Sequence, residues 1–261
     1  MPEMMRIQRA IARAGVASRR AADQLVASGR VRINGRVALI GESVDPDRDE
    51  ILVDGKPVAA RPAEARWVVL NKPSGVLTTR SDPGGRRTVF DIIEDSPGMI
   101  YVGRLDYMTE GVLLLTNDGE AAHKLTHPSG EVERTYLATV RGDGAAAARA
   151  AMKGVELEDG TVLPREFLAK RVGRGTWELQ ITIAEGRTRE VRRLCEALGL
   201  EVDRLVRTKF GPVKLGQLAT GKTRQLTARE KEIITALTKS GGTRKNTTRG
   251  SRRERTNRNS R

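Results

Sequence analysis

The sequence has few cysteine, histidine and aromatic residues. It contains one Cys and two His among 261 residues. These cannot supply a four-ligand zinc site, and a single thiol cannot form an internal disulfide, so we expect metal-free chemistry in a reducing compartment. Aromatic residues make up 3% of the chain and hydrophobic residues 38%, so the core is expected to be mainly aliphatic.

Long apolar runs are also missing. No stretch approaches the roughly 18 apolar residues that suggest a membrane span. The N-terminus lacks the apolar segment and the cleavage site of a secretion signal. We therefore expect a cytoplasmic protein that does not bind a membrane.

Positive charge is what the sequence has in excess. Lys and Arg number 47 against 33 Asp and Glu, which gives a formal net charge of +14. An anionic partner is therefore expected, and nucleic acid is the first candidate. The excess is uneven, because residues 1–36 carry +6, 37–60 carry −4, 61–239 carry +5 and 240–261 carry +7. Residues 240–261 hold no apolar side chain and are predicted to be a disordered basic tail, which either grips RNA phosphates or only aids solubility.

Residues 4–60 are expected to form a small separate unit. Ile7 and Ile11 recur at helical spacing before Gly15, and a second helix is expected between Ser18, a capping residue, and Gly29. Short strands that meet at Asn-Gly (34–35) and Asp-Gly (54–55) are typical of hairpins.

Arginines crowd the two helices and the first strand of this unit. Acidic residues are nearly absent there, which favours a surface that faces phosphates. The arginines are Arg9, Arg13, Arg19, Arg20, Arg30 and Arg32. Segments 14–22 and 29–35 resemble the alpha-L RNA-binding module of ribosomal proteins and RNA-modifying enzymes. Residues 61–65 are interpreted as a linker.

Residues 66–239 alternate strand-like and helix-like runs. Strands are expected at 67–70, 111–115, 136–140, 177–183 and 204–208, and helices at 120–125, 145–153, 189–198 and 228–237. Turn sequences at 117–119 and 158–160 are typical of hairpins. They favour an α+β fold with a mixed, largely antiparallel sheet over a doubly wound parallel one.

Two glycine-rich stretches imitate nucleotide-binding motifs. Residues 216–223 match the P-loop pattern, but the apolar strand before it, the helix after it and a second acidic motif are not evident. Residues 142–147 imitate a dinucleotide fingerprint, although the chain that follows is typical of a hairpin. We expect a glycine turn at the first stretch and a strand-to-helix turn at the second.

The stretch 102–119 is the densest candidate site. Asp106 lies between Gly103 and Gly111, two residues after Arg104, so its carboxylate is expected on a tight loop that enters an apolar strand. Spacing alone leaves two interpretations open, a functional carboxylate or an Asp that caps a turn.

This stretch, Gly103-Arg-Leu-Asp106-x-x-Thr109-x-Gly111, resembles the catalytic motif of the ribosomal RNA pseudouridine synthases. Segments 70–75, 134–140, 185–194 and 210–227 resemble other motifs of that family in the same order. The resemblance covers about residues 4–238 and is nearest the large-subunit type B branch through residues 80–91. Thr188 and Glu190 stand where the family more often has Asn and Gln.

The resemblance implies the isomerisation of a uridine to pseudouridine without a cofactor, a metal or ATP. Asp106 is implied as nucleophile at C1′ or as base at C2′, with Arg192 as the ion-pair partner that keeps it charged and Tyr136 stacked on the uracil. The target base must be flipped out. The residues implied in its binding are Lys72, Pro73, Arg104, Arg187, Arg189 and Arg193. Cys195 and the two histidines are expected to be structural.

The implied partner is ribosomal RNA, alone or in an assembly intermediate, bound by a monomer. Large-subunit RNA is favoured, and a small-subunit target stays open. Two other classes also stay open, a non-catalytic RNA-binding assembly factor on the same fold and a P-loop nucleotidase.

Overall fold

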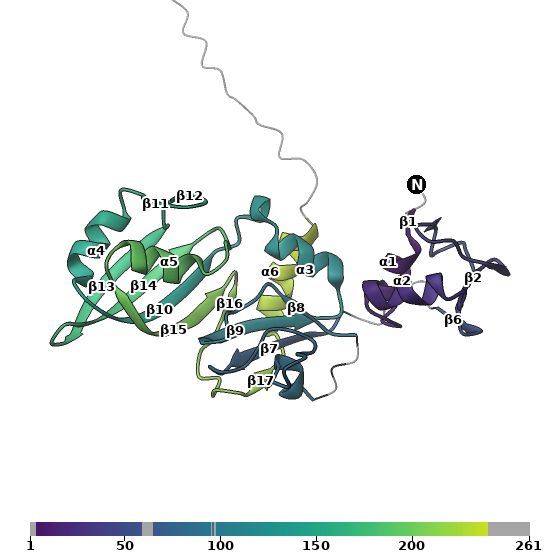
Figure 1. Ribbon diagram of the computed structural model, residues 1–261, viewed down its shortest axis with the longest axis horizontal. Coiled ribbons are helices and arrows are strands. Elements are labelled where there is room, and N and C mark those ends of the chain that lie inside the picture. The colour runs from purple at the N-terminus through teal and green to yellow at the C-terminus, as the bar shows by residue number, and fades with distance from the viewer. Residues whose placement is uncertain (1–3, 59–64, 95, 97, 240–261) are drawn as a thin grey trace, which may run out of the picture.

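The structure is a computed structural model that describes residues 4–58, 65–94, 96 and 98–239. One hydrophobic core is built from residues 5–58, and two more are built from residues 65–234. Figure 1 shows the N-terminal unit in purple, on the side of the molecule opposite β13 and β14. Of the predicted linker only Ala65 is described, and the predicted tail 240–261 lies outside the described residues.

In the N-terminal unit, two helices share a core with a four-stranded antiparallel sheet of order β3-β2-β5-β6. The hydroxyl of Ser18 accepts a hydrogen bond from the N–H of Ala21 at 3.2 Å and so begins α2. Both expected hairpin turns have positive φ at their two residues. The helices and turns predicted here are therefore confirmed. The elements are β1 (Met5–Arg6), α1 (Ile7–Arg13), α2 (Arg19–Ala27), β2 (Val31–Ile33), β3 (Arg36–Val37), β4 (Ser43–Val44), β5 (Ile51–Val53) and β6 (Lys56–Pro57).

The rest of the chain is organised around a nine-stranded sheet. Its main path is β13-β14-β10-β15-β9-β7-β17, with β8 paired to β9 and β16 to β15. Among the described residues every strand pair of this sheet is antiparallel except β9 with β15, so the predicted mixed, largely antiparallel α+β fold is confirmed. The strands are β7 (Trp67–Lys72), β8 (Ile100–Val102), β9 (Thr109–Thr116), β10 (Arg134–Arg141), β13 (Glu166–Gly173), β14 (Thr176–Ile183), β15 (Glu201–Phe210), β16 (Val213–Lys214) and β17 (Thr223–Arg224).

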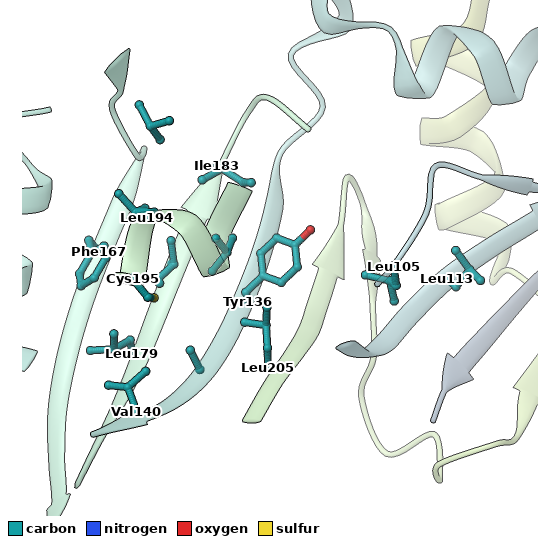
Figure 2. Close-up of a cluster of buried hydrophobic side chains, with 14 of the residues drawn as sticks. Leu105, Leu113, Tyr136, Val140, Phe167, Leu179, Ile183, Leu194, Cys195 and Leu205 are labelled. Carbon is teal, nitrogen blue, oxygen red and sulfur yellow. The ribbon is translucent and has the colours of Figure 1, made fainter. Parts of the chain in front are cut away.

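Strands β7 and β9 are buried on both faces. Leu70 and Leu113 belong to the core that contains residues of α4 and α5, whereas Val69 and Leu114 belong to the core of α3 and α6. Burial on both faces explains why these strands are continuously apolar. Figure 2 shows the first core, with the Tyr136 ring between Leu179 on one side and Leu105 on the other, and with its hydroxyl pointing away from Leu205. The helices are α3 (Gly119–Thr126), α4 (Gly144–Ala151), α5 (Glu190–Ala197) and α6 (Ala228–Lys239), and short 3-10 turns span Val89–Asp91 and Pro128–Gly130.

One predicted hairpin is wrong. The carboxylate of Asp118 accepts hydrogen bonds from the N–H groups of Glu120 and Ala121 at 3.1 and 3.0 Å, so residues 117–119 cap α3 and do not join two strands. An Asp at the N-cap of a helix accepts hydrogen bonds from backbone N–H groups of the first turn that would otherwise lack partners. The hairpin at 158–160 is confirmed, between β11 (Val155–Leu157) and β12 (Gly160–Val162).

Both nucleotide-like stretches are turns. Gly221 donates its N–H to the carbonyl of Asn71 at 2.8 Å, and strand β17 follows it where a P-loop would need a helix. Asp143 caps α4, and the antiparallel β11–β12 hairpin follows. None of the helices in the described part of the chain has the length and hydrophobicity of a membrane span.

Candidate active site

A cavity of about 490 Å³ brings together the three residues expected to act on the substrate. Asp106 comes from the loop between β8 and β9, Tyr136 from β10 and Arg192 from α5. Asp106 is half-buried, and the N–H of Thr109 donates to its carbonyl at 3.0 Å, which closes a turn at the start of β9. The loop therefore fixes the carboxylate at the wall of the cavity.

Lys72 supports the Asp106 loop through hydrogen bonds. Its side chain is fully buried, and its Nζ donates to the carbonyls of Pro73 at 2.9 Å, Tyr107 at 3.2 Å and Thr109 at 2.9 Å. Burial lowers the pKa of Lys72 to about 8, although the nearby carboxylates of Asp106 and Glu110 act in the opposite direction. Neither Lys72 nor Pro73 lines the cavity, so these two residues can affect a substrate only by positioning the loop that they support.

Arg192 lies near Asp106, but the expected ion pair between them is not formed. Its Nη2 donates to the carbonyl of Met108 at 3.3 Å. Burial and the neighbouring Arg189 lower the pKa of Arg192, whereas the charge of Asp106 raises it. Arg192 thus ties the same loop to α5 and acts on the carboxylate through space.

Tyr136 lines the cavity with Arg207 and Phe210, which the sequence did not identify as site residues. It is 8% exposed and is the cross-strand partner of Arg207, which is 2% exposed. The guanidinium of Arg207 lies 5.0 Å from the centre of the Phe210 ring, and its Nε donates to the carbonyl of Val112 at 2.8 Å. The burial of Arg207 cannot be predicted from the alternation of apolar and polar residues in a strand, because an Arg is normally exposed.

Arg134 is the third buried cation of the site. Its Nη1 donates to the carbonyls of Val132, Ala184 and Glu185 at 3.0, 3.0 and 2.7 Å. Burial lowers the pKa of its guanidinium. This residue links β10 to the segment that leads into α5.

Glu190, one of the two departures from the family pattern, is buried at the first turn of α5. Its carboxylate accepts the N–H of Arg187 at 3.1 Å, and burial raises its pKa. The preceding residue, Arg189, has φ 51°, in the left-handed region. Glu190 therefore stabilises the tight entry into the helix that carries Arg192.

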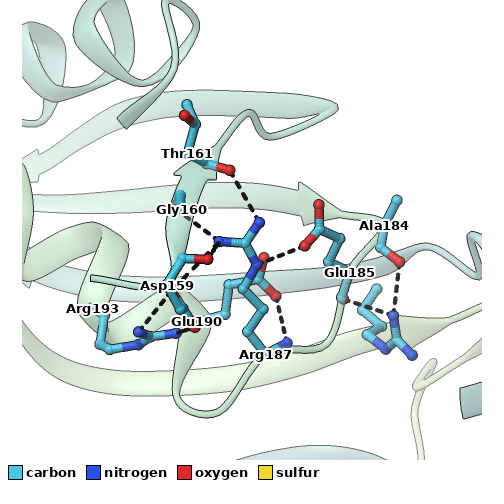
Figure 3. Close-up of polar contacts among 9 residues, drawn as sticks. Asp159, Gly160, Thr161, Ala184, Glu185, Arg187, Glu190 and Arg193 are labelled. Atoms are coloured by element: carbon cyan, nitrogen blue, oxygen red, sulfur yellow. Dashed lines mark hydrogen bonds and ion pairs between the residues drawn. The ribbon is translucent and has the colours of Figure 1, made fainter. Parts of the chain in front are cut away.

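Arg187 and Arg193 are engaged mainly in structural contacts. Figure 3 shows the Arg187 guanidinium among acceptors of the β11–β12 hairpin and Glu185, which it contacts at 2.6 Å. Arg193 makes a two-pronged ion pair with Asp159 at 3.0 and 2.7 Å. Of the six residues expected to bind the target, Arg104 and Arg189 are the ones that line the cavity with exposed side chains.

Three arginines of the N-terminal unit have partners within the protein. Arg9 pairs with Glu120, Arg30 pairs with Asp54 at 2.6 Å, and Arg32 donates to the carbonyl of Gly35 at 2.8 Å. Arg19 and Arg20 are exposed. A second cavity of about 840 Å³ lies between this unit and the large sheet, and Thr126 lines both cavities. The basic residues that line the second cavity are Arg9, Arg13, Arg19 and Arg80.

The remaining candidate residues are placed as structural groups. Cys195 is fully buried, and burial raises the pKa of its thiol to about 12. The rings of His123 and His127 lie 5.4 Å apart between centres at the end of α3, tilted by 44° to each other. Within the described residues, no three side chains of His, Cys, Asp or Glu are grouped so that they could hold a metal ion.

Comparison with known proteins gives two family matches. Residues 66–197 match the model of the RNA pseudouridylate synthase family, and residues 5–51 match that of the S4 domain.

Individual relatives cover nearly the whole chain. An uncharacterised RNA pseudouridine synthase of Aquifex aeolicus is 44% identical over 85% of this chain and 90% of its own. Ribosomal large subunit pseudouridine synthase B of Bacillus subtilis is 42% identical over 91% of this chain and 98% of its own. A crystal structure of a pseudouridylate synthase superposes with a TM-score of 0.60 at 28% identity, over 89% of this chain and 99% of that one.

Proposed function

This chain belongs to the RNA pseudouridylate synthase family, and from that premise we propose that it converts a uridine of large-subunit ribosomal RNA to pseudouridine, with Asp106 as the catalytic carboxylate. The observation that carries the proposal is the convergence of Asp106, Tyr136 and Arg192 on one cavity. Its volume of about 490 Å³ lies in the usual range for a small-molecule site, so it has room for a single extruded nucleotide.

The reaction needs a charged carboxylate, a surface that holds the detached base and a way to move protons. Asp106 attacks C1′ or removes a proton at C2′, and the N1–C1′ bond breaks. The uracil stays against the ring of Tyr136 while it turns. C5 then bonds to C1′ as the Asp106–C1′ bond breaks, or, in the second route, as the proton returns to C2′. The proton lost from C5 is balanced by the proton that N1 gains, so nothing is oxidised or reduced.

The cations around Asp106 support its charge in different ways. Arg192 and Lys72 both interact electrostatically with the carboxylate, although neither contacts it directly. Arg104 and Arg189, exposed at the cavity, are suited to bind the phosphates on either side of the flipped nucleotide.

The S4 domain and the second cavity suggest how the RNA approaches. We propose that residues 4–60 form the RNA-binding unit and residues 66–239 the catalytic one. The basic cavity between them continues toward the active site at Thr126 and would hold the RNA beside its target. In this proposal the protein acts as a monomer in the cytoplasm during ribosome biogenesis.

Release of tritium from the substrate tests the proposal. Ribosomal RNA labelled at uracil C5 should lose tritium to water when the wild-type chain is added. Asp106→Asn should reduce release by about 10²- to 10⁴-fold, because the amide can act neither as nucleophile nor as base. Asp203→Asn is a matched control, since Asp203 pairs with Arg141 at 2.7 Å and does not line the cavity. Wild-type protein that binds the RNA but releases no tritium would contradict the proposed activity.

A further inference from the structure

An exposed aromatic side chain stands directly beside the candidate catalytic residue. Tyr107 is 41% exposed and its neighbour Met108 57% exposed. All eight aromatic residues of the chain lie in the described part, and the other seven are buried or half-buried. A chain with so few aromatic residues thus places one where packing does not require it.

The main-chain carbonyls of residues 107–109 all accept hydrogen bonds. The carbonyl of Tyr107 accepts hydrogen bonds from Lys72 and from the N–H of Gly75, at 3.2 and 2.9 Å. The carbonyl of Met108 accepts from Arg192, and that of Thr109 from Lys72. The loop backbone is therefore fixed before RNA binds, and it presents the side chains of Tyr107 and Met108 to solvent. Little conformational entropy of the loop is lost on binding.

The surroundings favour a nucleobase as the occupant. Tyr107 lines the cavity together with the exposed cations Arg104 and Arg189, neither of which forms an ion pair with another described residue. An aromatic face flanked by unpaired cations matches single-stranded RNA, whose bases stack while its phosphates pair with the arginines.

We propose that Tyr107, with Met108 at its edge, is the stacking surface for the unpaired base next to the flipped uridine. This inference rests on the proposed function and deepens it, since it assigns part of the substrate choice to the two residues after Asp106. The stacked base holds open the gap that extrusion of the uridine leaves in the strand.

The Michaelis constant for RNA is the quantity to measure. Tyr107→Ala should raise KM about 5- to 150-fold, the range that corresponds to the loss of one base–aromatic stack, with a much smaller change in kcat. Tyr107→Phe keeps the ring and should stay within about threefold of wild type. Met152→Ala is the control for the loss of an exposed apolar side chain and should leave KM unchanged, because Met152 is 48% exposed at the end of α4 and does not line the cavity.

A second set of substrates tests the contact itself. Once the modified uridine is mapped, a large-subunit RNA fragment is made with an abasic nucleotide on its 5′ or its 3′ side. One of the two fragments should raise the KM of the wild type by the same factor as Tyr107→Ala does, and it should not raise the KM of Tyr107→Ala further.

The outcomes separate this inference from the function on which it rests. The stacking contact would be overturned if Tyr107→Ala had the same KM as the wild type, or if Tyr107→Phe and Tyr107→Ala raised KM equally. Neither result would contradict the proposed activity, which tritium release measures. RNA binding that depends on the Tyr107 ring, measured by filter retention in a protein that releases no tritium, would support the contact and contradict the activity. Additive losses for the abasic fragments and Tyr107→Ala would also overturn it.

Discussion

Replacement of Gly111 by Ala is expected to disturb the sheet and the site together. Gly111 lies in β9 opposite Arg207 of β15, at the parallel strand pair, and its φ is 103°. A Cβ at this position would lie 2.2 Å from the carbonyl oxygen of Arg207 and 2.7 Å from its nitrogen. These are backbone atoms, so they can give way only if the two strands separate.

The size of the effect follows from two contributions. A non-glycine residue at such a φ costs about 1–3 kcal/mol, and forcing an extra methyl into a packed site costs about another 1–3 kcal/mol. The two contributions add to about 2–6 kcal/mol, and a loss of about 3 kcal/mol within that range would be a large share of the roughly 5–15 kcal/mol that stabilises a typical domain. For a chain of this size it corresponds to a fall in Tm of about 6–12 °C.

Thermal unfolding followed by circular dichroism measures this effect, with Gly119→Ala as the matched control. A Cβ at Gly119, at the start of α3, would lie 3.6 Å from Ile100, an ordinary contact, so its Tm should stay within about 4 °C of wild type. If Gly111→Ala melted together with the wild type, the close contact between β9 and β15 would not be a feature of the protein in solution. Tritium release by Gly111→Ala below its Tm should also fall, because β9 carries the Asp106 loop.

Two further predictions concern the groups that hold the site. Lys72, with its pKa lowered to about 8, loses its proton in the folded state as pH rises through that value, so kcat should fall there, whereas Lys72→Arg should lack this decline. Since the unfolded pKa of lysine is about 10.4, this group makes folding more favourable as pH rises from 8 to 10, so a melting series should show stability increasing while activity falls. Asp159→Asn should weaken the ion pair with Arg193 but cost less than about 1 kcal/mol of stability and change kcat/KM less than about fivefold, because Asp159 is exposed and Arg193 only half-buried. A larger loss of activity would mean that Arg187 and Arg193 act on the RNA through this pair.

Much of the fold was predictable because local signals agreed with it. Ser18, the Asn34-Gly35 turn and the apolar run of β9 each indicate one structure in any context. Strand β13 was missed since it is an edge strand with Phe167 as its one buried residue, so it lacks an alternating pattern. Asn117-Asp118-Gly119 misled because the same letters suit a hairpin and a helix cap, and only the following chain decides between them.

The sequence predicted that Asp106, Tyr136 and Arg192 would come together, but it did not predict their contacts. Motif order places Asp106, Tyr136 and Arg192 in one family pattern, but whether Arg192 reaches the carboxylate or the Met108 carbonyl depends on how far α5 stands from the loop. The role of Gly111 could not be read either, because the backbone that excludes its side chain belongs to Arg207, far along the sequence.

The kind of partner that each cation has determines the charge of the site. On the surface, Arg193 and Arg204 are paired with the carboxylates of Asp159 and Glu110, so their charge is largely cancelled. The buried cations Lys72 and Arg134 donate instead to backbone carbonyls, which satisfy their hydrogens without neutralising them. Burial of an uncompensated charge is costly, and it is offset when an anion occupies the adjacent cavity. The charge that an anion meets at the site therefore depends on how the individual cations are partnered, and the net charge of the chain does not reveal it.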